Sequence, residues 1–208
     1  MDVALAGLSA AERYKLLIGL VVPRPIAFVS TRSADGRHNA APFSFFNLFA
    51  ETPPTVVLGI NDRARGPKDS ARNIEATGAF VVNVVSAALL EQVNLCSAEL
   101  PPEVDEIALA GLTAVPAAAV AAPRVAEAPA SLECRLTQII AIGPARRLVI
   151  GEIVHVHLRE GLLGPGWKVD PAALDAIGRL GGPWYARTRD LIRLDRPRGP
   201  VGGIPQIE

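Results

Sequence analysis

The sequence predicts a mainly β protein: a β-barrel of antiparallel strands with peripheral helices. Runs rich in β-branched residues outnumber runs with helical character. Turns rather than regular crossover helices connect most of them, which favours antiparallel pairing. The GxGxxG pattern of dinucleotide-binding folds is absent from the sequence, so a doubly wound sheet is disfavoured. With 50% hydrophobic residues, the chain can fill a core.

Composition argues against several classes of function. The 21 Lys and Arg balance the 21 Asp and Glu, and without a basic cluster we expect no nucleic-acid binding. The apolar run at residues 16–22 is too short to span a bilayer, so neither a membrane helix nor a signal peptide is expected. Cys96 and Cys134 are the only cysteines and form no CxxC pair, which favours a reducing, cytoplasmic location.

The first elements are predicted by local signals. Ser9 and Glu12 form a capping-box pattern that begins a short amphipathic helix, and this helix should stop before Pro23. Residues 26–30 have the apolar, aromatic character of a buried strand. The Ser-Ala-Asp-Gly sequence at residues 33–36 supplies a turn, so a first hairpin is expected here.

In the middle of the chain, two buried strands are predicted at residues 55–60 and 79–85, because both runs are rich in β-branched residues. One short helix is expected between them, at residues 69–76. Residues 99–130 contain many Ala, Pro and Glu with little periodicity. We interpret them as a long excursion over the surface with at most a short strand.

In the last third of the sequence, the pattern predicts a long hairpin followed by a short helix. Strands are expected at residues 132–142 and 148–158, and the Gly-Pro-Ala-Arg sequence at 143–146 suits the turn between them. A Gly/Pro-rich bend then leads to a short helix near residues 171–177.

Residues 39–47 combine three aromatic side chains, a proline, and amide and hydroxyl groups directly after the first hairpin. This mixture suits a planar ligand, because small polar groups reach its edge while apolar groups cover its face. The alternative is a strand with an aromatic core face, which is the commoner origin of such stripes.

Residues 66–73 stand where a loop enters a helix. Free backbone N–H groups, the helix dipole and the cations Lys68 and Arg72 converge there, which would stabilise an anion such as a phosphate. The alternative is an ordinary helix cap, formed by Asp69 or Ser70, with solvated charges.

Residues 179–187 combine two glycines with Trp, Tyr and two Arg. This loop could close over an aromatic ligand, although a Gly-Gly-Pro turn leading into a strand explains it equally well. His155 and His157 share one strand face, a permissible metal geometry. No carboxylate or cysteine cluster in the sequence pattern completes a ligand set, so we expect no metal and a structural or ligand-adjacent histidine instead. No GxSxG segment supports a nucleophilic serine.

Five segments, taken together, resemble the flavin-reductase-like, FMN-binding split-barrel family. They are residues 22–31, 39–47, 68–74, 80–83 and 179–182, the last followed by Tyr185, and they occur in the family's order. The resemblance implies a six-stranded antiparallel Greek-key split barrel, one domain over residues 1–208 with its core at about 22–197. It also implies a homodimer with one FMN in each of two clefts lined by both subunits.

The resemblance also implies roles for individual residues. Ser30 and Thr31 match the flavin-contacting pair at the end of the first strand. The isoalloxazine and ribityl stretch is matched by Asn39, Ala41, Pro42, Phe43, Ser44 and Asn47, the phosphate loop by Lys68, Asp69 and Ser70, and the late segment near the cofactor by Arg179 and Tyr185. Two departures stand out: Ser70-Ala71 where Thr-Leu is commoner, and Ala40 where Leu is frequent. Ser70 keeps the hydroxyl, so little change in binding is expected.

The expected activity is hydride transfer from NADH or NADPH to flavin N5, with reduced flavin passed on to a monooxygenase or another acceptor. Because the cofactor carries this chemistry, no acid–base pair is needed and no catalytic residue is assigned. Backbone N–H groups at residues 42–44 are the expected donors near flavin N5 and O4, and Arg179 the expected cation near N1. The alternatives are a flavoredoxin-like carrier with tightly bound FMN, reduced by a protein partner, and a flavin-binding sensory module without turnover.

Overall fold

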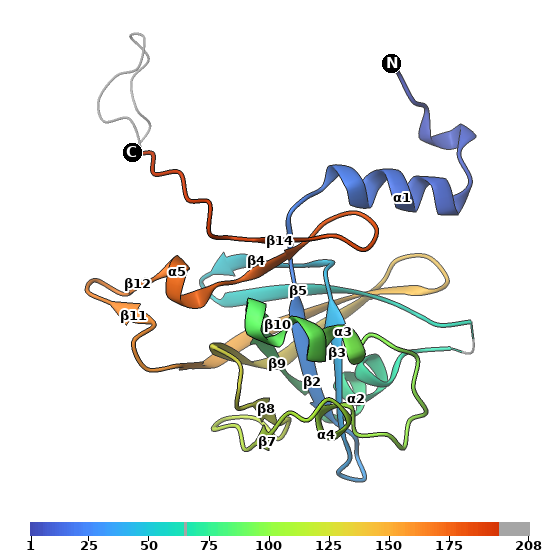
Figure 1. The fold of residues 1–208 in the computed structure, drawn as a ribbon. Helices are drawn as coiled ribbons and strands as arrows, with labels where there is room; N and C mark the ends of the chain where they lie inside the picture. The colour runs from blue at the N-terminus through green and yellow to red at the C-terminus, as the bar shows by residue number, and fades with distance from the viewer. Residues whose placement is uncertain (65, 196–208) are drawn as a thin grey trace.

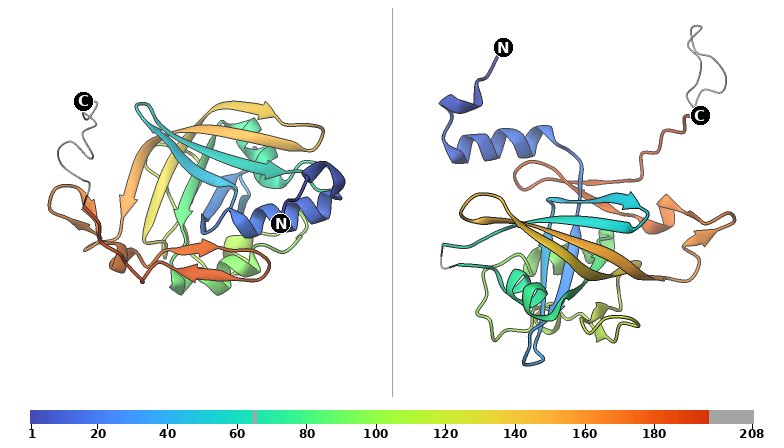
Figure 2. Two further views of the ribbon diagram at one scale, coloured as in Figure 1. Left: turned by 90° about the horizontal axis from the view of Figure 1, so that it is seen from above. Right: turned by 180° about the vertical axis from the view of Figure 1, so that it is seen from behind.

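The computed structural model describes residues 1–64 and 66–195 and has a large antiparallel sheet at its centre. Its seven strands follow the order β3-β2-β6-β9-β10-β5-β4. Their bounds are β2 (Ala27–Arg32), β3 (His38–Phe43), β4 (Phe46–Glu51), β5 (Pro54–Asn61), β6 (Ala79–Val84), β9 (Ala130–Ala141) and β10 (Arg146–Leu158). The sheet curls into an open barrel (Figures 1 and 2). The mainly β barrel class is confirmed.

The central sheet has seven strands where the resemblance implies six, and residues 39–47 contribute to two of them. Strand β3 ends at Phe43, the chain changes direction at residues 44–45, and β4 pairs with β5 at the opposite edge of the sheet. Gly59 on β5 makes this link possible. Its N–H donates to the Phe45 carbonyl at 2.6 Å, and a Cβ at this position would lie 2.9 Å from the Phe45 Cβ.

Smaller strand pairs surround the barrel. A three-stranded sheet joins β1 (Arg24–Pro25), β13 (Ile177–Arg179) and β14 (Tyr185–Arg187). Two further pairs are β7 (Ala114–Val115) with β8 (Arg124–Val125), and β11 (Leu163–Gly164) with β12 (Lys168–Val169). Residues 196 and 197, at the end of the expected domain core, lie outside the described residues.

The helices lie at the periphery, as the sequence predicts. They are η1 (Leu5–Gly7), α1 (Ala10–Leu20), α2 (Asp69–Thr77), η2 (Ala87–Leu89), α3 (Leu90–Leu95), α4 (Glu106–Leu109) and α5 (Pro171–Leu174). Helix α5 is shorter than the expected 171–177, because Asp175 adopts a left-handed conformation (φ 44°) and β13 follows. In the part of the chain that is described, we find no helix of the length and apolarity needed to cross a membrane.

The barrel interior holds one hydrophobic core, and the outer face of the sheet holds a second. Val29, Leu58 and Phe80 belong to the first. Phe28 on the outer face packs in the second cluster with Ile107 and Val125. The expectation that residues 99–130 only cross the surface is therefore wrong. The few large apolar side chains of this segment cover the outer face without regular spacing, so periodicity did not reveal them.

Helix α1 begins at the predicted capping box, with Glu12 N donating to Ser9 Oγ and Ser9 N donating to the Glu12 carboxylate. All 11 residues of this helix are described and none is buried. Tyr14, Leu17 and Leu20 are exposed. The helix stands above the barrel at the end opposite α2 and α4 (Figure 1). Leu16 and Ile18 are half-buried, so the helix has less cover than the barrel strands receive.

Candidate functional site

Two adjoining cavities form a groove beside strand β3. The first, about 180 Å³, lies between β3, the start of α2 and the segment after α3. The second, about 200 Å³, lies between α1, α3 and the β13–β14 hairpin. Pro42 and Ser97 line both cavities and connect them. Together these two cavities form what we call the groove.

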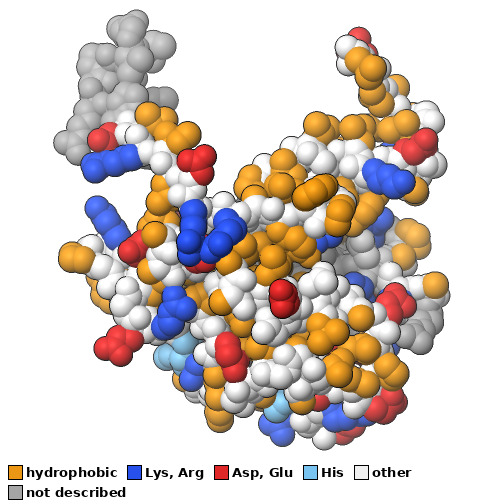
Figure 3. All heavy atoms as spheres, in the orientation of Figure 1, with side chains coloured by type: hydrophobic (Ala, Val, Ile, Leu, Met, Phe, Trp, Pro, Cys, Tyr) orange, Lys and Arg blue, Asp and Glu red, His pale blue; other side chains and the backbone are white. Residues whose placement is uncertain are grey.

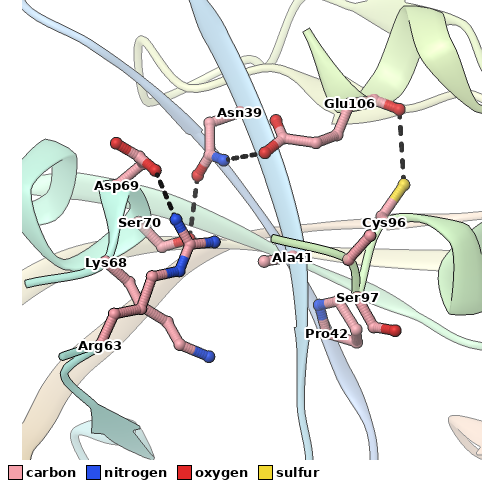
Figure 4. Close-up of a pocket in the computed structure, with 11 residues that line it drawn as sticks. Asn39, Ala41, Pro42, Arg63, Lys68, Asp69, Ser70, Cys96, Ser97 and Glu106 are labelled. Atoms are coloured by element: carbon pink, nitrogen blue, oxygen red, sulfur yellow. Dashed lines mark hydrogen bonds and ion pairs between the residues drawn. The ribbon is translucent and has the colours of Figure 1, made fainter. Parts of the chain in front are cut away.

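A hydrogen-bond network fixes the polar wall of the first cavity. Asn39 Nδ2 donates to Glu106 Oε1 at 2.8 Å, while Asn39 Oδ1 accepts from Ser70 Oγ at 2.9 Å and from Thr31 Oγ1 at 3.2 Å. Asn73 Nδ2 in turn donates to Thr31 Oγ1 at 3.0 Å. Figure 4 shows Asn39 pointing between Ser70 and Glu106. The oxygen of the Asn39 amide and one of its two N–H groups therefore hold neighbouring side chains.

The other wall of this cavity is cationic. Arg63 and Lys68 project into it from the loop before α2 (Figure 4). Arg63 contacts the Asp69 carboxylate at 3.4 Å, and its Nε lies 3.8 Å from a Glu99 carboxylate oxygen, too far for a hydrogen bond, so this buried Nε has no hydrogen-bond partner among the described residues. Burial, and then the charge of Arg63, lower the pKa of Lys68. Two cations that repel each other and a buried donor without an acceptor make this wall suited to an anion.

The N-terminus of α2 adds backbone donors to the same wall. Lys68 occupies the N-cap position, and no described side chain accepts a capping hydrogen bond there. The alternative of an ordinary cap by Asp69 or Ser70 is therefore wrong. Ser70 is turned to Asn39, and Asp69 pairs with Arg63 and Arg72. The first N–H groups of the nine-residue helix remain available to a ligand.

Glu106 is a member of the site that the sequence did not reveal. Its side chain is buried, and it accepts hydrogen bonds from Asn39 Nδ2 and, at 3.1 Å, from Ala40 N. Burial raises the pKa of this carboxyl group. The same environment, with Glu106 close by, raises the pKa of Cys96 to about 12, so this thiol is not an ionised nucleophile. Nothing in the aperiodic segment around Glu106 marks it as part of a site.

The second cavity has an aromatic and cationic lining. The Arg179 guanidinium lies over the Tyr185 ring, with Cζ 4.4 Å from the ring centroid, and its Nη2 donates to the Gly182 carbonyl at 2.6 Å. Tyr14 from α1 and Ser44 after β3 complete this end. Arg179 and Tyr185 therefore hold each other across the β13–β14 hairpin, at the end of the groove away from Lys68.

Nine of the residues expected from the sequence line the groove. They are Asn39, Ala41, Pro42, Lys68, Asp69 and Ser70 in the first cavity, and Ser44, Arg179 and Tyr185 in the second, which Pro42 also lines. Arg63, Glu106 and Ser97 line it without having been expected.

Four expected residues do not line the groove. Ser30 is buried and donates to the Pro123 carbonyl, and Thr31 acts through Asn39. Phe43 belongs to the barrel core, and the Lys68 ammonium lies 5.3 Å from its ring centroid. Asn47 lies on β4 and lines a different cavity.

Of the three positions 42–44 at which backbone N–H donors to the flavin are expected, the strand geometry leaves only one. Ala40 N–H points away from β2, to Glu106, and backbone groups two residues apart on a strand point the same way. Position 42 therefore also faces outward, but proline carries no N–H. Phe43 N–H faces β2 by the same alternation. Only Ser44, beyond the end of β3, keeps an N–H free of this pattern.

A third cavity, about 640 Å³ and mostly apolar, lies between α1 and strands β4, β5 and β10, and shares Ser44 with the groove. Arg24 stands at the junction. Its Nη1 donates to the carbonyls of Ile18 at 2.6 Å and Val21 at 2.7 Å, its Nη2 to the Leu180 carbonyl at 3.0 Å, and its Nε to Ser44 Oγ at 3.4 Å. One buried guanidinium thus holds the end of α1 and the loop after β13 beside Ser44.

Comparison with known proteins gives one matching family model, the flavin reductase like domain, over residues 19–174. An uncharacterised protein of Halalkalibacterium halodurans is 44% identical over 196 residues, 91% of this chain and 93% of that protein. Nitrilotriacetate monooxygenase component B from Bacillus cereus superposes with a TM-score of 0.90 at 34% identity, covering 93% of this chain and 98% of that one. The 2-nitrobenzoate 2-nitroreductase of Pseudomonas fluorescens gives 0.87 at 36% identity, covering 98% and 100%.

Proposed function

This chain belongs to the flavin reductase-like domain family, and from this membership we propose that it binds FMN in the groove and transfers hydride from NADH or NADPH to it. One observation carries the proposal: a single groove joins a cationic wall with an unused buried donor to an aromatic end. FMN has a phosphate at one end and a flat ring at the other, which matches this polarity. The two cavities together fall within the usual ~300–1,000 Å³ of ligand sites.

The residues of the groove divide the binding between them. Arg63, Lys68 and the first N–H groups of α2 would hold the phosphate, as cations and helix N-termini do elsewhere. The Asn39 network would position this wall, because the Asn39 oxygen and one of its N–H groups are already paired with neighbouring side chains. Pro42 and Tyr185 would cover the ring, with Ser44 N–H at its polar edge and Arg179 as the nearby cation. Bound FMN would supply the two-electron chemistry itself.

We further propose that the chain forms a homodimer and that the second copy completes the groove. An isolated helix of 11 residues is marginal in water, yet α1 forms with Tyr14, Leu17 and Leu20 exposed. Leu48 and Phe49 on β4 are exposed as well. Figure 3 shows hydrophobic side chains gathered on the upper face between α1 and the segment leading to residue 195. A patch of this kind indicates a protein interface, and Tyr14 ties it to the groove.

The dimer is tested by mass in solution. We expect twice the chain mass from light scattering for the wild type, and a monomer with weakened FMN binding for the double variant Leu17→Glu, Leu20→Glu. The matched control is Lys15→Glu on the same helix. A wild type that is monomeric at micromolar concentration while binding FMN would refute the shared groove.

Two solved structures, 34% and 36% identical to this chain, suggest the electron acceptor. A monooxygenase component B and a nitroreductase both superpose over nearly the whole chain. We propose a monooxygenase that takes up reduced flavin as the acceptor. If the purified protein itself reduced a nitroaromatic compound faster than it reduced added free FMN, this part of the proposal would fail.

The activity is tested by one absorbance experiment. Purified protein reconstituted with FMN should be yellow, and anaerobic addition of NADH or NADPH should bleach it. Protein that binds FMN but is bleached by neither nucleotide, with or without added flavin, would contradict the reductase activity. Tight FMN that only a protein donor reduces would instead indicate an electron carrier.

A further inference from the structure

Three side chains of metal-ligating type, none of which lines the groove, meet on one face of strands β9 and β10. His155 lies directly opposite Glu133 in the strand register, and His157 is two residues further along the same face. One ligand atom from each of the three lies within 4.8 Å of the others. The sequence pattern showed the two histidines without a carboxylate, because only strand pairing brings Glu133 to them.

Glu133 is held as a buried carboxylate by the loop that covers it. Its side chain accepts hydrogen bonds from the backbone N–H groups of Ala118 at 2.7 Å, Ala119 at 2.6 Å and Val120 at 3.1 Å. The residue is fully buried. Desolvation raises its pKa, but these hydrogen bonds and the contact with His157 outweigh that effect and leave the pKa below its ordinary value. The three backbone hydrogen bonds therefore hold the carboxylate in a fixed orientation, as supporting contacts do for a metal ligand.

The remaining contact of Glu133 points at His157. His157 Nε2 lies 2.5 Å from Glu133 Oε1, so one proton is shared or donated between them. His155 lies beside His157, with ring centroids 4.7 Å apart, and is exposed. Glu133 Oε1 also accepts the hydrogen bond from Ala118 N–H. An ion that binds Oε1 therefore has to displace only the hydrogen bond with His157.

We propose that Glu133, His155 and His157 bind a divalent transition metal ion, with Zn²⁺ as the representative ion, and that the ion replaces the proton between Glu133 and His157. Two histidines and one carboxylate form a recognised three-ligand set that leaves a fourth position for water. Imidazole nitrogen favours ions such as Zn²⁺ over Mg²⁺ or Ca²⁺. A neutral imidazole at His157 would carry its single proton on Nδ1, which leaves the Nε2 lone pair for the ion.

The site needs only a small rearrangement to receive the ion. Bonds of ~2.0–2.2 Å to nitrogen and oxygen at a tetrahedral angle put these two atoms roughly 3.3 Å apart. The pair must therefore open by somewhat less than 1 Å from its 2.5 Å. Both histidines reach solvent, so the movement can occur on their side while Glu133 stays fixed. Arg135, on the same face of β9, is turned away and donates to the Ala119 carbonyl at 3.4 Å.

Zn²⁺ titration of untagged, flavin-free protein tests the site, because the readout does not depend on flavin or turnover. The chain has three histidines, so His38→Gln is a matched control for His155→Gln and His157→Gln. We expect one Zn²⁺ per wild-type chain in competition with a chromophoric chelator. Affinity should fall about tenfold or more in either variant, since even supporting residues of metal sites cost ~10–100-fold when changed. His38→Gln should bind as the wild type does.

A second measurement separates metal loss from misfolding. Saturating Zn²⁺ should raise the thermal unfolding temperature of the wild type and of His38→Gln, and should leave that of His155→Gln unchanged. His155 is exposed, so this variant should unfold near the wild-type temperature without metal. The proposal is overturned if the wild type binds no Zn²⁺, or if His155→Gln and His157→Gln bind it as tightly as the wild type.

Discussion

Changing Lys68 to glutamine tests the assignment of the cationic wall to a phosphate. The substitution removes the charge while keeping a polar side chain of similar reach. Lys68 lies partly buried beside Arg63, and burial and that neighbouring charge lower its pKa. A dianionic phosphate would therefore relieve repulsion between the two cations. In the variant, Arg63 and the first N–H groups of α2 would have to hold the phosphate without Lys68.

The expected magnitude follows from the interaction that the substitution removes. A hydrogen bond to a charged group contributes ~1.5–3 kcal/mol in a partly buried position. FMN affinity should therefore fall by about 10- to 150-fold. Riboflavin lacks the phosphate, so its affinity should stay within about twofold of the wild type, because Lys68 lines the first cavity and not the second.

Flavin fluorescence quenching measures both dissociation constants for both proteins. Lys168→Gln is the matched control, because Lys168 is exposed on β12, away from the groove. If FMN binding is unchanged in Lys68→Gln, or if riboflavin weakens by the same factor as FMN, the phosphate does not lie at Lys68 and the proposed orientation of the ligand is wrong.

Three further predictions concern buried positions. The depressed pKa of Glu133 stabilises the fold above the ordinary carboxyl value of about 4.3, and this stability is lost as the pH falls through the folded pKa. Wild-type melting temperatures should therefore drop more steeply on acidification than those of Glu133→Gln, and parallel curves would contradict this. The pKa of Glu106 is raised, so its contribution is present at low pH and lost as the pH rises through the folded value. Glu106→Gln should thus gain stability relative to the wild type as the pH rises above the ordinary carboxyl value of about 4.3, and a constant difference in calorimetry would argue against it. Gly151→Ala would place a Cβ 2.6 Å from Phe80 Cζ and should cost ~1–3 kcal/mol in urea unfolding. Gly19→Ala, with open space around it, should instead stabilise α1 by ~0.5–1 kcal/mol; equal effects would refute the packing argument.

Features with local causes could be predicted from the sequence. The capping box at Ser9 and the turn at residues 143–146 depend on neighbouring residues, and both are found. The buried strands β5 and β6 follow from their β-branched composition. The anion-suited entry to α2 depends on residues close in sequence, so its cations could be identified before the structure was known.

Features that depend on distant contacts could not be predicted. Strand β4 exists because residues 44–45 cross to the far edge of the sheet, where Gly59 leaves room for Phe45. Glu106 belongs to the site only because α4 packs on β3, and Arg63 only because its loop folds back over Asp69. Composition and periodicity cannot predict these contacts, because the residues that make them are far apart in the sequence and lie in no motif.

The hydrogen bonds of Arg24 make two distant parts of the chain open together. If α1 or the loop after β13 detached alone, the guanidinium would lose carbonyl partners inside a low-dielectric region, and an unpaired buried charge is strongly unfavourable. We therefore expect residues 18–24 and 177–187 to open as one cooperative unit. Their amide protons should exchange with solvent at a common free energy of opening, although more than 150 residues of chain lie between them.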